Sequence, residues 1–153
     1  MKPSNPESKI ESRSLDFSWK TKLVEETFAG RSFRFHALKS LDETIDDLFA
    51  LLEKTGNPNL LEDLCPYFGH LWPSARGLCE HLAAHPIEKN GAQKVIEVGC
   101  GLAIPSLYLS KTIKLSKILA TDFHPEVGAF FDANVELNSI SNERLTYREL
   151  NWR

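Results

Sequence analysis

The sequence has no hydrophobic run approaching the roughly 18 apolar residues that a membrane-spanning helix requires. Its first residues, MKPSNPESKIESRS, lack the apolar centre of a signal peptide. No segment recurs at the spacing of about 20 to 50 residues that marks repeat proteins. We therefore expect no membrane partner and no repeat architecture, and we expect residues 1–14 to form a flexible tail.

An excess of positive charge is also lacking, because 18 Lys and Arg residues stand against 21 Asp and Glu residues. The net charge of −3 gives no positive field for nucleic acid, and we expect no such partner. Cysteine is scarce: Cys65, Cys79 and Cys100 are an odd number without close pairing. This usage is typical of a reducing compartment, so we expect a cytoplasmic protein.

The segment 15–93 is predicted to begin with a small β element. Apolar and polar residues alternate on both sides of Ala29-Gly30, which predicts a β-hairpin. Apolar residues at helical spacing, with acids first and a lysine last, predict a helix over 42–54. A second helix is predicted from about Pro73, with Leu78 and Leu82 facing inward.

From Lys94 the pattern alternates between strands and helices. We predict strands at 94–98, 117–121 and 145–150, and helices at about 102–112 and 126–138. This order indicates a parallel sheet with helices packed on it, in an α/β, Rossmann-like three-layer sandwich that follows the N-terminal hairpin and helix. The apolar residues Val95, Ile96 and Val98 are typical of a strand buried on both faces.

The turn after the first of these strands predicts a ligand site. Glu97 lies near the carboxyl end of the strand, where open α/β sheets bind ligands. Gly99 and Gly101 let the backbone turn sharply and approach a bound molecule, and the next helix offers N–H groups to a polar or anionic group. Asp122, which ends the second strand, is placed to accept hydrogen bonds from ribose hydroxyls. The pattern indicates a ribosyl ligand.

A dinucleotide is one alternative for this ligand. A G-x-G-x-x-G match beginning at Gly99 would place Ile104 where the motif has its last glycine. Without that glycine the helix cannot pack closely in the manner of NAD- and FAD-binding folds. The sequence therefore favours another ribosyl cofactor.

The stretches VIEVGCGLAIPSL and LATDFHPEV resemble the first motif and the second-strand acid of class I, seven-strand S-adenosylmethionine-dependent methyltransferases. The stretches PYFGHLWPSARGLCEHL and FDANVELN, with YRELNWR, are similar to the small protein-lysine methyltransferases of that class. The likeness runs from about Leu23 to Arg153. It implies S-adenosylmethionine as cofactor, part of a seven-strand sheet as fold, and a protein lysine as methyl acceptor.

The resemblance assigns the methionine part of the cofactor to three backbone positions, Gly99, Cys100 and Gly101. By the same resemblance Glu97 would lie near the cofactor's amino group, and Trp72 would cover the methionine side. No catalytic residue is assigned, since methyl transfer depends mainly on alignment of the acceptor amine behind the methyl group.

For the nucleoside part, the resemblance implies that Asp122 holds the ribose hydroxyls and that Phe123 packs beside the adenine. Asn151 and Trp152 would lie at the adenine edge. One departure is Ala103, which stands at a position where the family commonly has glycine and adds one methyl group.

The family's sheet continues through four further strands, and the fourth strand ends in an acidic motif that positions the substrate lysine. The 153 residues contain no counterpart, and the strand 95–98 would be an exposed sheet edge. We therefore expect residues 94–153 to be the cofactor-binding half of the fold, with catalysis requiring more chain or a complementing protein. The edge also predicts self-association.

Three other interpretations stay open. The acceptor of a methyltransferase could be a small molecule, because cofactor motifs do not specify the acceptor. The chain could be a non-catalytic S-adenosylmethionine-binding or regulatory module, or an α/β protein without cofactor. His81 and His85, with Cys79 nearby, lie at a spacing that suggests a metal, but Cys79 would point to a different helix face, so we expect no metal site.

Overall fold

The computed structural model describes residues 8–12, 14–87, 94–112, 117–141 and 143–152. Its strands are β1 (Ser8–Glu11), β2 (Ser18–Phe28), β3 (Arg31–Leu38), β4 (Lys94–Val98), β5 (Lys117–Asp122) and β6 (Leu145–Glu149). Its helices are α1 (Leu41–Lys54), α2 (Leu61–Leu64), α3 (Pro73–Ala84), α4 (Ile104–Thr112) and α5 (Val127–Leu137), with short 3-10 turns at Pro58–Leu60 and Pro66–Gly69.

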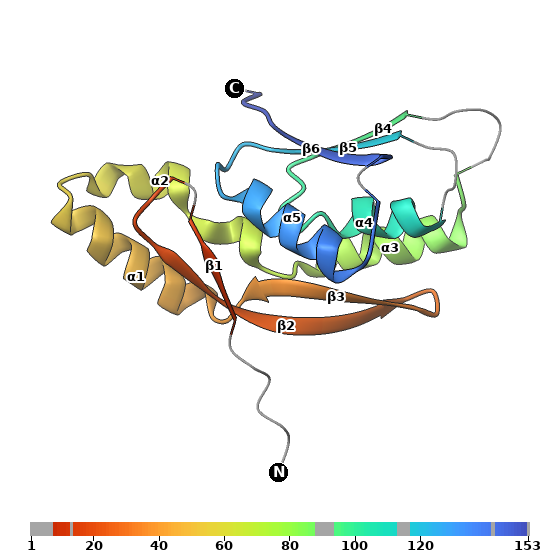
Figure 1. The fold of residues 1–153 in the computed structure, drawn as a ribbon, viewed down its shortest axis with the longest axis horizontal. Helices are drawn as coiled ribbons and strands as arrows, with labels where there is room; N and C mark the ends of the chain where they lie inside the picture. Colours follow the sequence, from red (N-terminus) through yellow and green to blue (C-terminus); the bar gives the residue numbers. More distant parts are fainter. Residues whose placement is uncertain (1–7, 13, 88–93, 113–116, 142, 153) are drawn as a thin grey trace, which may run out of the picture.

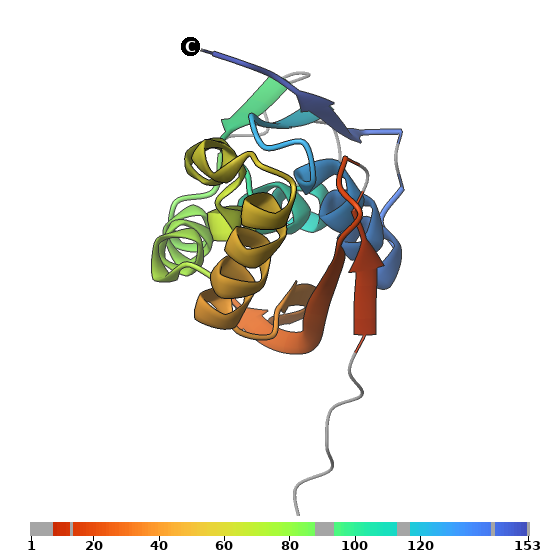
Figure 2. The same ribbon diagram turned by 90° about the vertical axis from the view of Figure 1, so that its left-hand side faces the viewer.

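The elements form three layers, which confirms the predicted Rossmann-like α/β fold. One layer is the parallel sheet, in the order β4-β5-β6. Helices α3, α4 and α5 lie between this sheet and the antiparallel sheet β1-β2-β3 (Figure 1). Helices α1 and α2 lie together at one end of the layers, the end that faces the viewer in Figure 2. Among the described residues, buried side chains of both sheets belong to the same hydrophobic cluster.

The hairpin joins β2 to β3 at Ala29 and Gly30, with φ angles of 47° and 74°. Two positive φ angles define the type I′ turn, in which asparagine followed by glycine is preferred because alanine is strained there. The predicted hairpin is confirmed, and the alternating residues Phe33, Phe35 and Ala37 form the buried face of β3.

Replacement of Ala29 by asparagine is expected to raise the free energy of unfolding by about 0.5–1 kcal/mol, because asparagine tolerates the left-handed conformation. Urea denaturation measures the change. The matched control is Ala50→Asn on the exposed face of α1, where helix propensity predicts a loss of about 0.6 kcal/mol. A loss of stability in both variants would contradict the turn assignment.

Polar side chains of α5 and of the residues at its two ends fasten this helix to the N-terminal segment and its sheet. Asn138 and Asn134 accept hydrogen bonds from the backbone N–H groups of Arg34 (3.0 Å) and His36 (2.7 Å). These side chains therefore provide acceptors for N–H groups on the edge of β3 that no neighbouring strand among the described residues pairs with. The fully buried carboxylate of Glu126 accepts hydrogen bonds from the Trp19 indole (3.2 Å) and from the Ser14 backbone (3.0 Å). These bonds hold the antiparallel sheet β1-β2-β3 against α5.

Two predictions about packing are wrong. Residues 8–11 do not belong to a flexible tail, because β1 pairs with β2 and Ile10 packs against the core. In α3 the inward residue is Cys79, whereas Leu78 is 45% exposed. Leu82 does pack against the core, together with Ala75. These three inward positions are spaced four and three residues apart, as one face of a helix requires.

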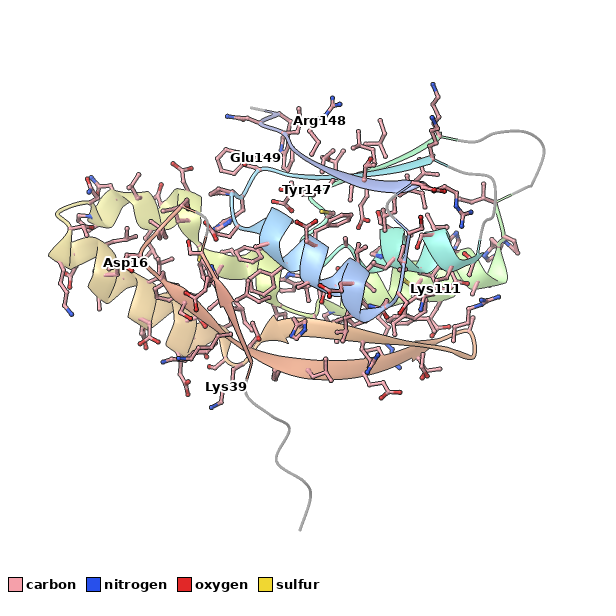
Figure 3. All side chains as sticks on the ribbon, viewed as in Figure 1. Asp16, Lys39, Lys111, Tyr147, Arg148 and Glu149 are labelled. Carbon is pink, nitrogen blue, oxygen red and sulfur yellow. The ribbon has the colours of Figure 1, made fainter. Side chains whose placement is uncertain are left out.

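The outer face of the parallel sheet is bare in the part of the chain that the structure describes. Tyr147 points to the helix side, where its ring lies 5.4 Å from Phe131, and Arg148 points to the opposite side (Figure 3). Ile96 and Val98 are 64% and 60% exposed on the edge strand β4. The prediction that this strand is buried on both faces is therefore wrong, because the helices cover only one face.

Candidate cofactor site

The carboxyl ends of β4 and β5 meet at the same edge of the sheet, because Val98 is paired with Thr121 in a parallel register. The turn 99–101 and the loop that starts at Asp122 therefore lie next to each other. A cavity of about 720 Å³ opens at this edge. The segment 65–72 and the first turns of α3 form its other wall.

In the glycine turn, residues 99–101, backbone N–H groups donate hydrogen bonds to other atoms of the protein. Gly99 and Gly101 have φ angles of 69° and 50°, and Ala103, at 55°, also adopts the left-handed conformation that favours glycine. The N–H of Cys100 donates to Thr121, and that of Ala103 donates to the Cys100 carbonyl. Because these donors are occupied, the turn offers a ligand mainly acceptors and a close backbone approach.

Glu97 points to the helix side of β4, toward the first turn of α4. Its carboxylate accepts hydrogen bonds from both the backbone N–H (3.0 Å) and the hydroxyl of Ser106. Pro105 has no N–H, so the start of α4 offers a ligand fewer donors than the sequence suggests. Burial raises the pKa of Glu97 to about 7, and the nearby charge of Asp122 adds to the rise, while the Ser106 bonds oppose it.

Asp122 is nearly buried and already carries two backbone hydrogen bonds. Its Oδ2 accepts the N–H of Gly101 at 2.9 Å, and its Oδ1 accepts the N–H of His124 at 3.0 Å. Each carboxylate oxygen can accept more than one bond. The two backbone bonds fix the orientation of the carboxylate at the cavity wall.

The aromatic loop, residues 65–72, closes the cavity over the glycine turn. A Cβ atom added at Gly101 would lie 2.9 Å from the carbonyl oxygen of Phe68, so only glycine fits beneath this loop. The Trp72 indole donates to the Tyr67 carbonyl at 3.0 Å, which fixes the ring at the cavity mouth. Tyr67 and Trp72 are both about half exposed there.

The structure brings most of the predicted site residues together. The cavity wall includes Trp72, Glu97, Gly99, Cys100, Gly101, Asp122 and Phe123. Asn151 and Trp152 lie outside this wall, and the Trp152 ring centroid is 6.5 Å from that of Phe123. Their contact with an adenine stays a prediction.

Among the wall residues that the sequence did not assign to the site, Phe68 and His124 are the most deeply placed aromatic pair. Phe68 and His124 are buried, and their ring centroids are 4.3 Å apart. Only the position of His124, two residues after the strand-ending acid, could have indicated that it reaches the site.

The predicted absence of a metal site has no direct test. Among the described residues, no group of three His, Cys, Asp or Glu side chains could hold an ion. The rings of His81 and His85 stack at 4.4 Å, and His85 Nδ1 lies 3.2 Å from the His81 carbonyl.

A parallel sheet with a glycine turn and an acid at adjacent strand ends defines the class of the protein: it is a class I S-adenosylmethionine-dependent methyltransferase fold. Residues 63–153 match the family model described as lysine methyltransferase, and the chain belongs to this family. S-Adenosylmethionine is the cofactor of the family. No curated protein matches the chain.

A similar solved structure is the N-terminal domain of human METTL16 in complex with SAH. It is 18% identical, with a TM-score of 0.38 over 84% of this chain. The chain spans 50% of the length of that solved chain. In the described residues, no helix is long and apolar enough to cross a membrane.

Proposed function

We propose that the chain binds S-adenosylmethionine in this cavity and serves methyl transfer to lysine side chains of proteins. The observation that carries the proposal is the convergence of Glu97, the glycine turn and Asp122 on one hollow at the strand ends. The ammonium group of the methionine part would meet Glu97 and the backbone acceptors of the turn. The ribose hydroxyls would bond to Asp122.

The chemistry requires little from the protein beyond alignment. The lone pair of a neutral lysine amine attacks the methyl carbon, the carbon–sulfur bond breaks, and its electron pair stays on sulfur. The methylated amine then loses a proton to water. The cavity would contribute by holding the methyl group in line with the amine.

The experiment that tests binding is titration calorimetry of S-adenosylmethionine into the purified chain. Micromolar affinity supports the proposal, and no binding by a folded chain overturns it in favour of a module without cofactor. Methylation is then assayed with a lysine peptide and with small amines. Transfer to small amines alone would favour the small-molecule alternative.

We also propose that acceptor binding requires further protein, which could be more chain or a complementing partner. The support is the bare outer face of the sheet, with Ile96 and Val98 exposed on the edge strand. Robust protein methylation by the 153-residue chain alone would contradict this proposal. The three unpaired cysteines fit a reducing, cytoplasmic location.

Association through the bare face is testable with Ile96→Lys. A second copy of the chain seated on this face would make the wild type dimerise with rising concentration, because apolar side chains would leave water. A lysine on the outer face is expected to shift the molecular mass measured by light scattering to that of a monomer. Thr146→Lys, on the same face of the opposite edge strand β6, is the control for added charge away from Ile96 and β4. A monomeric wild type would contradict self-association.

Binding of the cofactor is expected to depend on pH through Glu97. The pKa of about 7 means that this carboxyl is neutral below that pH, and only the ionised form pairs with an ammonium group. Affinity should therefore fall about tenfold per pH unit below 7. The same raised pKa makes the free chain lose stability as pH rises from 4.5 to about 7.

Calorimetry between pH 5.5 and 8.5 measures this dependence. Glu97→Gln keeps the shape of the side chain and removes the titration, so its affinity should be low and flat across the range. An equally steep slope in this variant would show that another group is responsible.

A further inference from the structure

His124 joins two segments that form opposite walls of the cavity. Its Nε2–H donates to the carbonyl of Leu64, the last residue of α2, at 3.0 Å. Its Nδ1 accepts the backbone N–H of Glu126 at 3.2 Å. A carbonyl on one side and an N–H on the other allow one arrangement only, the neutral ring with its proton on Nε2. Burial also lowers the pKa of His124 from 6.5.

Both partners of this ring belong to the site. Leu64 directly precedes the aromatic loop, and the backbone N–H of His124 holds Asp122 at 3.0 Å. The His124 ring also packs on Phe68, whose carbonyl oxygen lies over Gly101. The His124 side chain thus contacts the aromatic loop, and the His124 backbone orients Asp122, the residue predicted to bind the ribose hydroxyls.

We propose that His124 is a positioning residue, whose neutral Nε2–H imidazole ties the aromatic loop to the Asp122 loop and so preforms the cofactor cavity. The inference rests on the proposed function. Without the bond to Leu64, α2 and the aromatic loop would have to be ordered when the cofactor binds, and that ordering reduces affinity. His124 does not itself take part in methyl transfer.

Two amide substitutions separate the two nitrogen atoms of the ring. His124→Gln places an N–H near the position of Nε2 and keeps the bond to Leu64. His124→Asn places an acceptor near the position of Nδ1, keeps the bond from Glu126 and is too short to reach Leu64. S-Adenosylmethionine affinity should stay within about threefold of wild type in the glutamine variant and fall at least tenfold in the asparagine variant.

Hydrogen exchange of residues 61–69 gives a readout without cofactor: it should quicken in His124→Asn and stay near wild type in His124→Gln. Phe28→Leu, a core change outside the cavity wall, controls for general loss of stability and should leave affinity unchanged. Equal affinity in the two His124 variants, with a wild type that binds, overturns this inference alone. A wild type that does not bind overturns the proposed function and this inference with it.

Discussion

Replacing Asp122 by alanine is expected to weaken S-adenosylmethionine binding at least about 100-fold. The substitution removes the acceptor of the ribose hydroxyls and also releases the N–H groups of Gly101 and His124, which the carboxylate now holds. Hydrogen bonds to a charged group contribute about 1.5–3 kcal/mol each, and two such bonds correspond to a loss of this size. Calorimetry with the folded variant measures it.

Two further variants make the Asp122 result interpretable. Asp122→Asn replaces one oxygen by an NH2 group that would face a backbone N–H, so it should also bind poorly. Glu136→Ala removes an exposed acid from α5, away from the cavity wall, and should stay within twofold of wild type. Unchanged affinity in a folded Asp122→Ala protein would refute the assignment of the ribose site.

The second large effect is expected at Gly101. Alanine at this position adopts a φ of 50° and brings its Cβ to 2.9 Å from the Phe68 carbonyl oxygen, so the backbone of the aromatic loop has to move. We expect Gly101→Ala to lower the free energy of unfolding by about 2–4 kcal/mol, the sum of left-handed strain and overpacking. Urea denaturation measures the loss.

Gly99→Ala is the matched control, because Gly99 has a φ of 69° and no atom within 4 Å of an added Cβ. Gly99→Ala should lower the free energy of unfolding by the left-handed strain alone, about 1–2 kcal/mol. The difference between the two variants measures the close approach of Phe68 to the turn. Equal losses would mean that the loop does not press on Gly101 in solution.

The parts of the fold set by local pattern were predictable. Alternating apolar residues and the Ala29-Gly30 turn predicted the hairpin, and the order of strands and helices after Lys94 predicted the parallel sheet. Adjacent parallel strand ends then brought Glu97, Gly101 and Asp122 to one cavity. These features depend on spacing along the chain, which the sequence states directly.

Features that depend on distant partners were not predictable. Ile96 and Val98 have a core composition, and nothing in their own segment says that one face of the sheet is bare. Apart from Ile10, residues 8–11 are polar, and they become a strand by pairing with β2, far outside any pattern of their own. The ring of His124 reaches Leu64, 60 positions earlier, and no local pattern encodes that bond.

The asparagine bonds that complete the edge of β3 have a consequence for synthesis of the protein. Asn138 and Asn134 follow Arg34 and His36 by 104 and 98 positions, so they leave the ribosome long after the hairpin. At about 5–20 residues per second, the delay is about 5–20 s. During this interval the nascent hairpin has an open backbone edge, and it is the segment on which a ribosome-associated chaperone would act.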